Sequence, residues 1–168
     1  MGEADARRAS IIEQCVDLML DVAEGVSTSE QREISHKAVR TLGYVCANAL
    51  AVGADSALDK SCSYIERYVD HAIQESDYES LKAAVAPIGS IAQNAATHGR
   101  MDKIGSMLPL LKKAAEQARN ANDTEMLDEI ITQTGFIAKK TVEMGAETLE
   151  AATEAEVSDA GEEFPAAE

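Results

Sequence analysis

The feature of this sequence that most restricts its fold is an internal repeat with a period of 46 residues. Two glycines recur in register three times without a gap: Gly43, Gly89 and Gly135 at the first position, and Gly53, Gly99 and Gly145 at the second. A period of this length is typical of arrays in which one small supersecondary unit stacks on the next. The sequence therefore predicts three copies of one structural unit.

Apolar side chains within each period have the spacing of two helices. One stripe of apolar or small residues recurs at intervals of three and four: Ala38, Val39, Leu42, Val45, Cys46, Ala49 and Leu50. A second stripe, exemplified by Ile12, Val16, Met19 and Ala23, recurs with the same period. Such spacing places side chains on one face of a helix. The prediction is an all-α chain with helices near 9–25, 28–52, 56–75, 77–98, 101–120 and 123–144.

Glycines, caps and prolines refine this prediction. Gly53, Gly99 and Gly145 fit the left-handed position just past a helix end, whereas Gly43, Gly89 and Gly135 fall inside helices, where close approach of a neighbouring helix explains them.

Ser76 with Glu79, and Asn122 with Glu125, have the spacing of capping boxes. Pro87 and Pro109 fall inside predicted helices and should kink or break them, and the helix near Pro109 should begin late.

The 46-residue pairs of helices resemble the HEAT and armadillo repeats over about residues 9–145. The resemblance implies an α-solenoid, although the Asp and Arg ladder common in HEAT repeats does not recur at one register. A six-helix bundle with internal duplication would give the same pattern. On either reading, residues 1–8 form a flexible N-terminus, 9–145 the helical repeat domain, and 146–168 an acidic, mostly disordered tail, whose first part could extend the last helix.

Charge and cysteine usage restrict the partners. The formal net charge of −15 argues against nucleic acid and anionic membranes, which attract basic surfaces. It is consistent with solubility, with adaptation to high salt, or with a basic protein partner. No apolar run of membrane-spanning length and no signal segment is visible, so we expect a cytoplasmic protein. Cys15, Cys46 and Cys62 form no zinc motif or evident disulfide framework, which suits reduced thiols. We expect no cofactor and no metal site.

One segment resembles a catalytic motif. Residues Ile34 to Leu42 resemble the helical phospho-acceptor box of sensor histidine kinases, with His36 as the acceptor. That family usually has an acidic residue directly after the histidine and then an Arg-Thr-Pro run, whereas Lys37 follows here and Thr41 leads to Leu42. The repeat aligns His36 with polar residues, which predicts an exposed side chain. A helical histidine phosphotransfer domain is thus one alternative function.

No catalytic constellation is evident, so the leading prediction is a non-enzymatic protein–protein interaction module, a small helical scaffold or adaptor. HEAT-like arrays can host chemistry, as in phycobilin lyases, so a ligand-binding helical-repeat lyase is a further alternative. The predicted partner-binding strip comprises Tyr64, Arg67, Tyr68, Lys112 and Lys113, because Tyr and Arg are typical interface anchors. The strip could instead be an ordinary solvated face, with both tyrosines mainly in the core. A homodimer through an end of the array is also expected, since the last helix has no following partner.

Overall fold

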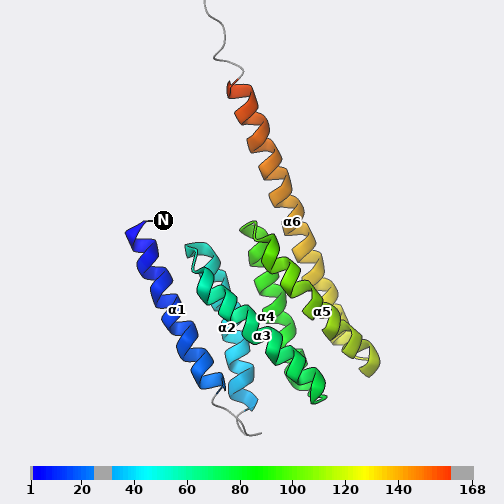
Figure 1. Cartoon of the computed structure of the whole chain (residues 1–168). Helices are drawn as coiled ribbons and strands as arrows, with labels where there is room; N and C mark the ends of the chain where they lie inside the picture. Colours follow the sequence, from blue (N-terminus) through cyan, green and yellow to red (C-terminus); the bar gives the residue numbers. More distant parts are fainter. Residues whose placement is uncertain (1, 25–31, 160–168) are drawn as a thin grey trace, which may run out of the picture.

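The helices lie close to their predicted positions. The computed structural model describes residues 2–24 and 32–159, with side chains described to residue 145. These residues form six helices and no strand, which confirms the all-α prediction: α1 (Glu3–Glu24), α2 (Arg32–Val52), α3 (Asp55–Gln74), α4 (Tyr78–Thr97), α5 (Met101–Ala121) and α6 (Thr124–Asp159) (Figure 1).

Both terminal helices are longer than predicted. Helix α1 begins at Glu3, so residues 3–8 are helical, and the acidic residues in its first turn favour a helix start. Helix α6 runs to Asp159 and projects beyond the other helices (Figure 1). The predicted disorder of the tail is therefore not confirmed over 146–159, a stretch without proline or glycine and rich in Ala and Glu, which are good helix formers. Residues 160–168 lie outside the described residues.

The helices form three consecutive pairs, each packed against the next. Helix α2 contacts α4, and α4 contacts α6, while α1, α3 and α5 form the second row in the same order (Figure 1). No Cα atom of α1 or α2 lies within 8 Å of α5 or α6. The middle pair, α3 and α4, therefore separates the first pair from the last.

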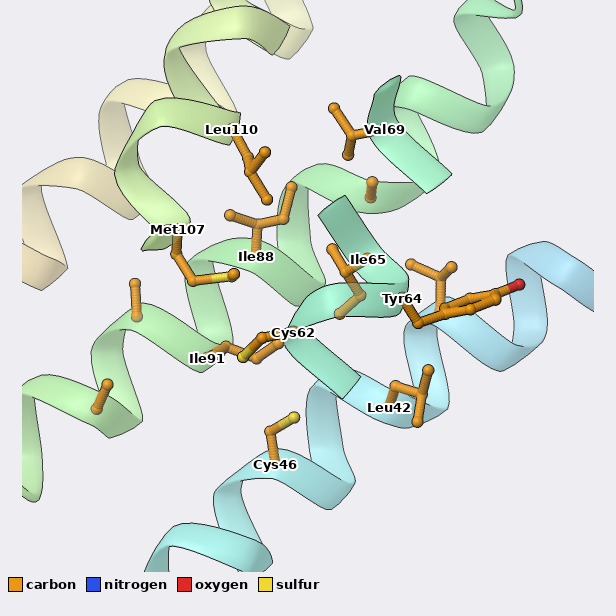
Figure 2. Packing of buried hydrophobic residues seen from close by; sticks show 14 of the residues in the cluster. Leu42, Cys46, Cys62, Tyr64, Ile65, Val69, Ile88, Ile91, Met107 and Leu110 are labelled. Carbon is orange, nitrogen blue, oxygen red and sulfur yellow. The ribbon is translucent and has the colours of Figure 1, made fainter. Parts of the chain in front are cut away.

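The core follows the apolar stripes that recur every 46 residues. Side chains from α2, α3, α4 and α5 converge between the two rows, with Leu42, Ile65 and Ile88 completely buried (Figure 2). Burying one such aliphatic side chain contributes roughly 1.5–3 kcal/mol. Cys46 and Cys62 belong to this core, and a hydrogen bond with Cys62, together with burial, raises the pKa of Cys46.

The helix caps differ from the prediction by one residue. The N-cap of α4 is Asp77, whose carboxylate accepts a hydrogen bond from the Ser80 amide at 3.2 Å. Asp123 accepts in the same way at the start of α6, at 2.9 Å. Ser76 and Asn122 instead have φ near +54° and end the preceding helices. The predicted capping boxes at Ser76 and Asn122 are therefore wrong, because those residues serve the turn and the aspartates after them serve the cap.

The turn glycines behave as predicted in two of three copies. Gly53 and Gly99 have φ of +69° and +66°, the left-handed conformation that favours glycine after a helix. The prediction for Gly145 is wrong, because α6 continues through it. Pro87 and Pro109 break neither α4 nor α5, and α5 begins at Met101 and not late.

The glycines inside helices have unequal surroundings. A Cβ on Gly43 would lie 3.0 Å from the Pro87 Cα of α4, so the predicted close approach is confirmed there. A Cβ on Gly89 would overlap the Gln133 side chain of α6. A Cβ on Gly135 would meet nothing within 4 Å, so the prediction is wrong for this copy. The glycine is needed where the next pair of helices packs against it.

Candidate protein-interaction site

Helix α3 brings three of the five predicted strip residues to one cavity. Tyr64, Arg67 and Tyr68 have the spacing of one helix face and line a cavity of about 830 Å³. The cavity lies between the end of α1, the start of α2, and the turn from α3 to α4, where Asp77 and Tyr78 contribute. The structure thus gathers residues from four helices around this face of α3.

The two tyrosines form the apolar wall of the cavity. Tyr64 is 7% exposed, and its ring stacks on that of Tyr68 with centroids 6.3 Å apart. His36 of α2 meets the Tyr68 ring edge-on at 6.4 Å. Burial raises the pKa of Tyr68 to about 12, so its phenol is neutral at physiological pH.

A polar cluster lies beside this wall. The Ser80 hydroxyl donates to Asp77 at 2.8 Å, and the Nε2 of His36 lies 2.9 Å from the same hydroxyl oxygen. The Nε of Arg32 lies 3.1 Å from the Asp77 carboxylate. Burial disfavours the charge of Asp77, but the hydrogen bonds from Ser80 and the charge of Arg32 outweigh it and lower the pKa of Asp77. The carboxylate is therefore held in its ionised form at the start of α4.

This cluster does not have the arrangement of a nucleophilic triad. The Ser80 hydroxyl donates its hydrogen bond to Asp77, so its oxygen accepts a hydrogen bond from the His36 ring. His36 is therefore not placed as the base that would remove the proton of this serine. His36 is half-buried, contrary to the exposed position predicted for it. Its Nε2 is occupied by the bond to Ser80.

A related contact between neighbouring pairs recurs one period later. Asp123 caps α6, and the Nζ of Lys82 lies 3.1 Å from its carboxylate. Lys82 follows His36 by 46 residues, and Asp123 follows Asp77 by 46. His36 reaches Ser80, which bonds to the cap Asp77, whereas Lys82 reaches the cap Asp123 directly. The sequence carried the signal in the spacing of the two aspartates, but the prediction missed it.

The basic residues of the strip belong to a second repeated contact. Arg67 pairs with Glu24 at 2.5 Å, and Lys113 pairs with Asp70 at 2.6 Å. The two acidic residues are 46 positions apart, and so are the two basic residues. The two ion pairs are therefore equivalent links, one between α1 and α3 and the other between α3 and α5. An acid–base ladder at one register was not predicted. The five strip residues therefore do not form one site: Tyr64, Arg67 and Tyr68 line the cavity, Lys113 belongs to the ladder, and Lys112 is exposed outside the cavity lining.

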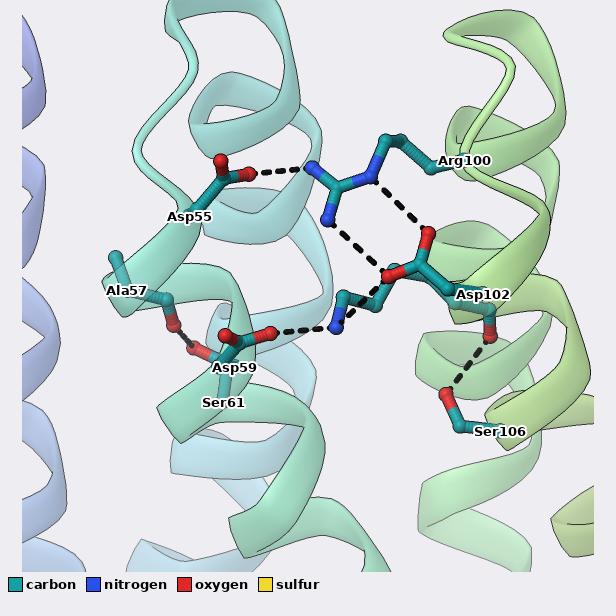
Figure 3. A network of polar contacts seen from close by, with 8 residues as sticks. Asp55, Ala57, Asp59, Ser61, Arg100, Asp102 and Ser106 are labelled. Atoms are coloured by element: carbon teal, nitrogen blue, oxygen red, sulfur yellow. Dashed lines mark hydrogen bonds and ion pairs between the residues drawn. The ribbon is translucent and has the colours of Figure 1, made fainter.

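A third polar network joins the first turns of α3 and α5. Arg100, the N-cap of α5, contacts Asp55 of α3 and Asp102 of α5 (Figure 3), and Lys103 reaches Asp59 of α3. The hydrogen bond from Arg100, opposed in part by burial, lowers the pKa of Asp102 to about 2. These contacts join neighbouring pairs of helices at the end of α3 opposite to the cavity.

Comparisons with known proteins identify no relative. No protein-family model matches the chain, and neither the curated proteins nor the solved structures include a match. Within residues 2–24 and 32–159, no three His, Cys, Asp or Glu side chains are grouped to hold a metal ion. In the same part of the chain, none of the helices combines the length and apolarity that a membrane span requires.

Proposed function

We propose that this protein is a non-enzymatic protein–protein interaction module, a small cytoplasmic scaffold or adaptor. We propose further that its helical pairs form an α-solenoid similar to HEAT and armadillo arrays. Support for the solenoid comes from the lack of contact between the first and last pairs, because a closed six-helix bundle would join them.

The observation that carries the proposal is the cavity of about 830 Å³ beside α3. Its wall is aromatic, with stacked Tyr64 and Tyr68, and its rim is charged. Binding sites commonly combine an apolar wall with a few polar groups that fix orientation. Tyrosines and arginines also dominate the binding energy of many protein interfaces.

The charge of the rim favours a basic partner segment. Arg67 and Arg32 are paired with Glu24 and Asp77, so their charges are already compensated. Glu75 and Glu79 are exposed at the rim, and no ion pair involves either of them among the described residues. A partner that presents Lys or Arg would pair with these two carboxylates, and the net charge of −15 would steer it toward the protein.

Site-specific photo-crosslinking tests this proposal. A photoreactive amino acid in place of Arg67 should crosslink a discrete protein in extracts, whereas the same group in place of Arg7 on α1 should not. Arg7 is exposed and remote from the cavity lining, which makes it a matched control.

Charge reversal at the rim sharpens the test. The double variant Glu75→Lys/Glu79→Lys should lose the crosslinked product, while the control Glu13→Lys/Glu116→Lys, outside the cavity lining, should keep it. Identical products from positions 67 and 7, or a product insensitive to reversal at Glu75 and Glu79, would contradict binding in the cavity.

A further inference from the structure

One face of α6 is uncovered although the same face is buried in both equivalent helices. Five register positions are buried in α2 and α4: Val39, Leu42, Gly43, Cys46 and Leu50 in the first, and Val85, Ile88, Gly89, Ala92 and Ala96 in the second. In α6 these positions are all exposed, and we name them the α6 face: Ile131, Thr134, Gly135, Ala138 and Val142. Ile131 is 69% and Val142 72% exposed. Large apolar side chains exposed together on one face mark an interaction surface.

The difference has a direct geometric cause. In α2 and α4, the glycine of this face lies against a residue 44 positions later, Pro87 for Gly43 and Gln133 for Gly89. In the described part of the chain, no helix takes that place beside Gly135. A glycine inside a helix costs about 1 kcal/mol relative to alanine. Among the described residues no contact accounts for that cost at Gly135, and a contact with another molecule would do so.

The spacing of the α6 face suits a second α6 running in the opposite direction. Ile131, Gly135, Ala138 and Val142 are separated by four, three and four residues, a sequence of intervals that reads the same from either end. Around a two-fold axis midway between Gly135 and Ala138, Ile131 lies opposite Val142 of the second copy, and Gly135 lies opposite its Ala138. Such pairing is self-complementary, as a two-fold interface requires. The small central residues allow the two helices to approach closely.

Charge also favours a second copy over a basic partner at this face. The net charge of −15 makes two copies repel each other over most of their surface. Residues 130–142 contain no carboxylate and include Lys139 and Lys140. Two acidic molecules can therefore meet along this stretch without bringing carboxylates together. A basic segment, the partner expected at the cavity, would find no carboxylate within this stretch to pair with, and Lys139 and Lys140 already pair with Glu143.

We propose that two copies of this chain associate through the α6 face, with their α6 helices antiparallel and Gly135 packed against Ala138 of the second copy. The association uses a surface separate from the cavity beside α3. It joins two arrays end to end, so the two cavities belong to one assembly.

The mass of the full chain in solution, measured by analytical ultracentrifugation over a range of concentrations, tests the association. The wild type should dimerise reversibly. Ile131→Glu/Val142→Glu should weaken dimerisation by about 100-fold or more, because it places carboxylates in the contact. Phe136→Glu is the matched control, since Phe136 is 51% exposed on the same helix but outside the α6 face. It should change the affinity by less than about tenfold. Wild-type mass that stays monomeric at every concentration overturns the proposal, as does a dimer indifferent to Ile131→Glu/Val142→Glu.

Disulfide trapping tests the antiparallel arrangement in a Cys15→Ser background, which removes the exposed native thiol. Mixing Ile131→Cys chains with Val142→Cys chains should yield the mixed crosslinked dimer. Ile131→Cys chains alone should crosslink far less, and their efficient crosslinking would overturn the antiparallel pairing. Crosslinking at the cavity should be unaffected by Ile131→Glu/Val142→Glu, so failure of the dimer and failure of the proposed function are separate outcomes.

Discussion

Helices α4 and α6 carry side chains at the same register in opposite surroundings. Ile88 is completely buried in α4, whereas its equivalent in α6, Thr134, is exposed. Helix α4 contacts both α2 and α6 in its own row, whereas among the described residues α6 contacts only α4 in that row, besides its pair partner α5. The comparison shows that a position in this repeat acquires its energetic importance from the next pair of helices and not from its own helix.

Truncation of equivalent side chains should produce the largest contrast. Ile88→Ala in α4 should lower the free energy of unfolding by about 2–5 kcal/mol, because it leaves a cavity in a packed core. Thr134→Ala in α6 should change it by less than about 0.5 kcal/mol, as is usual for exposed sites. Urea denaturation at low protein concentration, where the chain is monomeric, measures both. Equal losses would show that the two helices are covered alike.

Alanine at equivalent glycines should change stability in opposite directions. Gly43→Ala should destabilise by about 1–3 kcal/mol, because the new Cβ is forced against Pro87 of α4. Gly135→Ala should stabilise the monomer by up to about 1 kcal/mol, because alanine is the better helix former and the space is open. The same denaturation experiment decides this, and a loss of stability in Gly135→Ala would mean that a neighbour of α6 is already present.

The two aspartate N-caps should behave alike, so the contrast between α4 and α6 should not extend to the first turns of these helices. Asp77→Ala should cost about 1 kcal/mol, the usual loss for an N-cap, and Asp123→Ala should change stability in the same direction. The pKa of each carboxyl is lowered from its ordinary 3.8 in the folded protein, Asp77 despite burial and Asp123 mainly by the Met126 amide. The unfolded chain therefore binds the proton more readily, so this stability is present above pH 3.8 and is lost as pH falls through the folded pKa.

Unfolding followed between neutral and acidic pH checks this prediction. The difference between wild type and Asp77→Ala should shrink at low pH, and Asp123→Ala should follow the same course. A difference that is unchanged under acidic conditions would mean that the carboxylate charge does not support the helix start.

The repeat itself could be predicted because its signal is local. Stripes of apolar residues at intervals of three and four, with glycines every 46 residues, were enough to define six helices and the core positions of α2 and α4, but not those of α6. The caps were misplaced by one residue because Ser76 and Asn122 also fit a capping motif. Only their left-handed backbone, which depends on how α3 and α5 end, separates the two roles.

The candidate site was predicted only in part. Tyr64, Arg67 and Tyr68 share a helix face, so sequence periodicity could group them. The cavity depends on where α1, α2 and the turn at Asp77 lie in space, which no spacing within α3 reveals. His36 was compared with a phospho-acceptor motif because the sequence does not show that Ser80 lies beside it.

The lack of contact between the first and last helical pairs has a mechanical consequence. Among the described helices, a load applied at α1 reaches α6 through either α3 or α4, the two helices of the middle pair. The stiffness of the molecule between its two outer pairs should therefore be set by the middle pair, α3 and α4. A binding event that tightens the packing of α3 against α4 would change the relative orientation of the two outer pairs without altering either one internally.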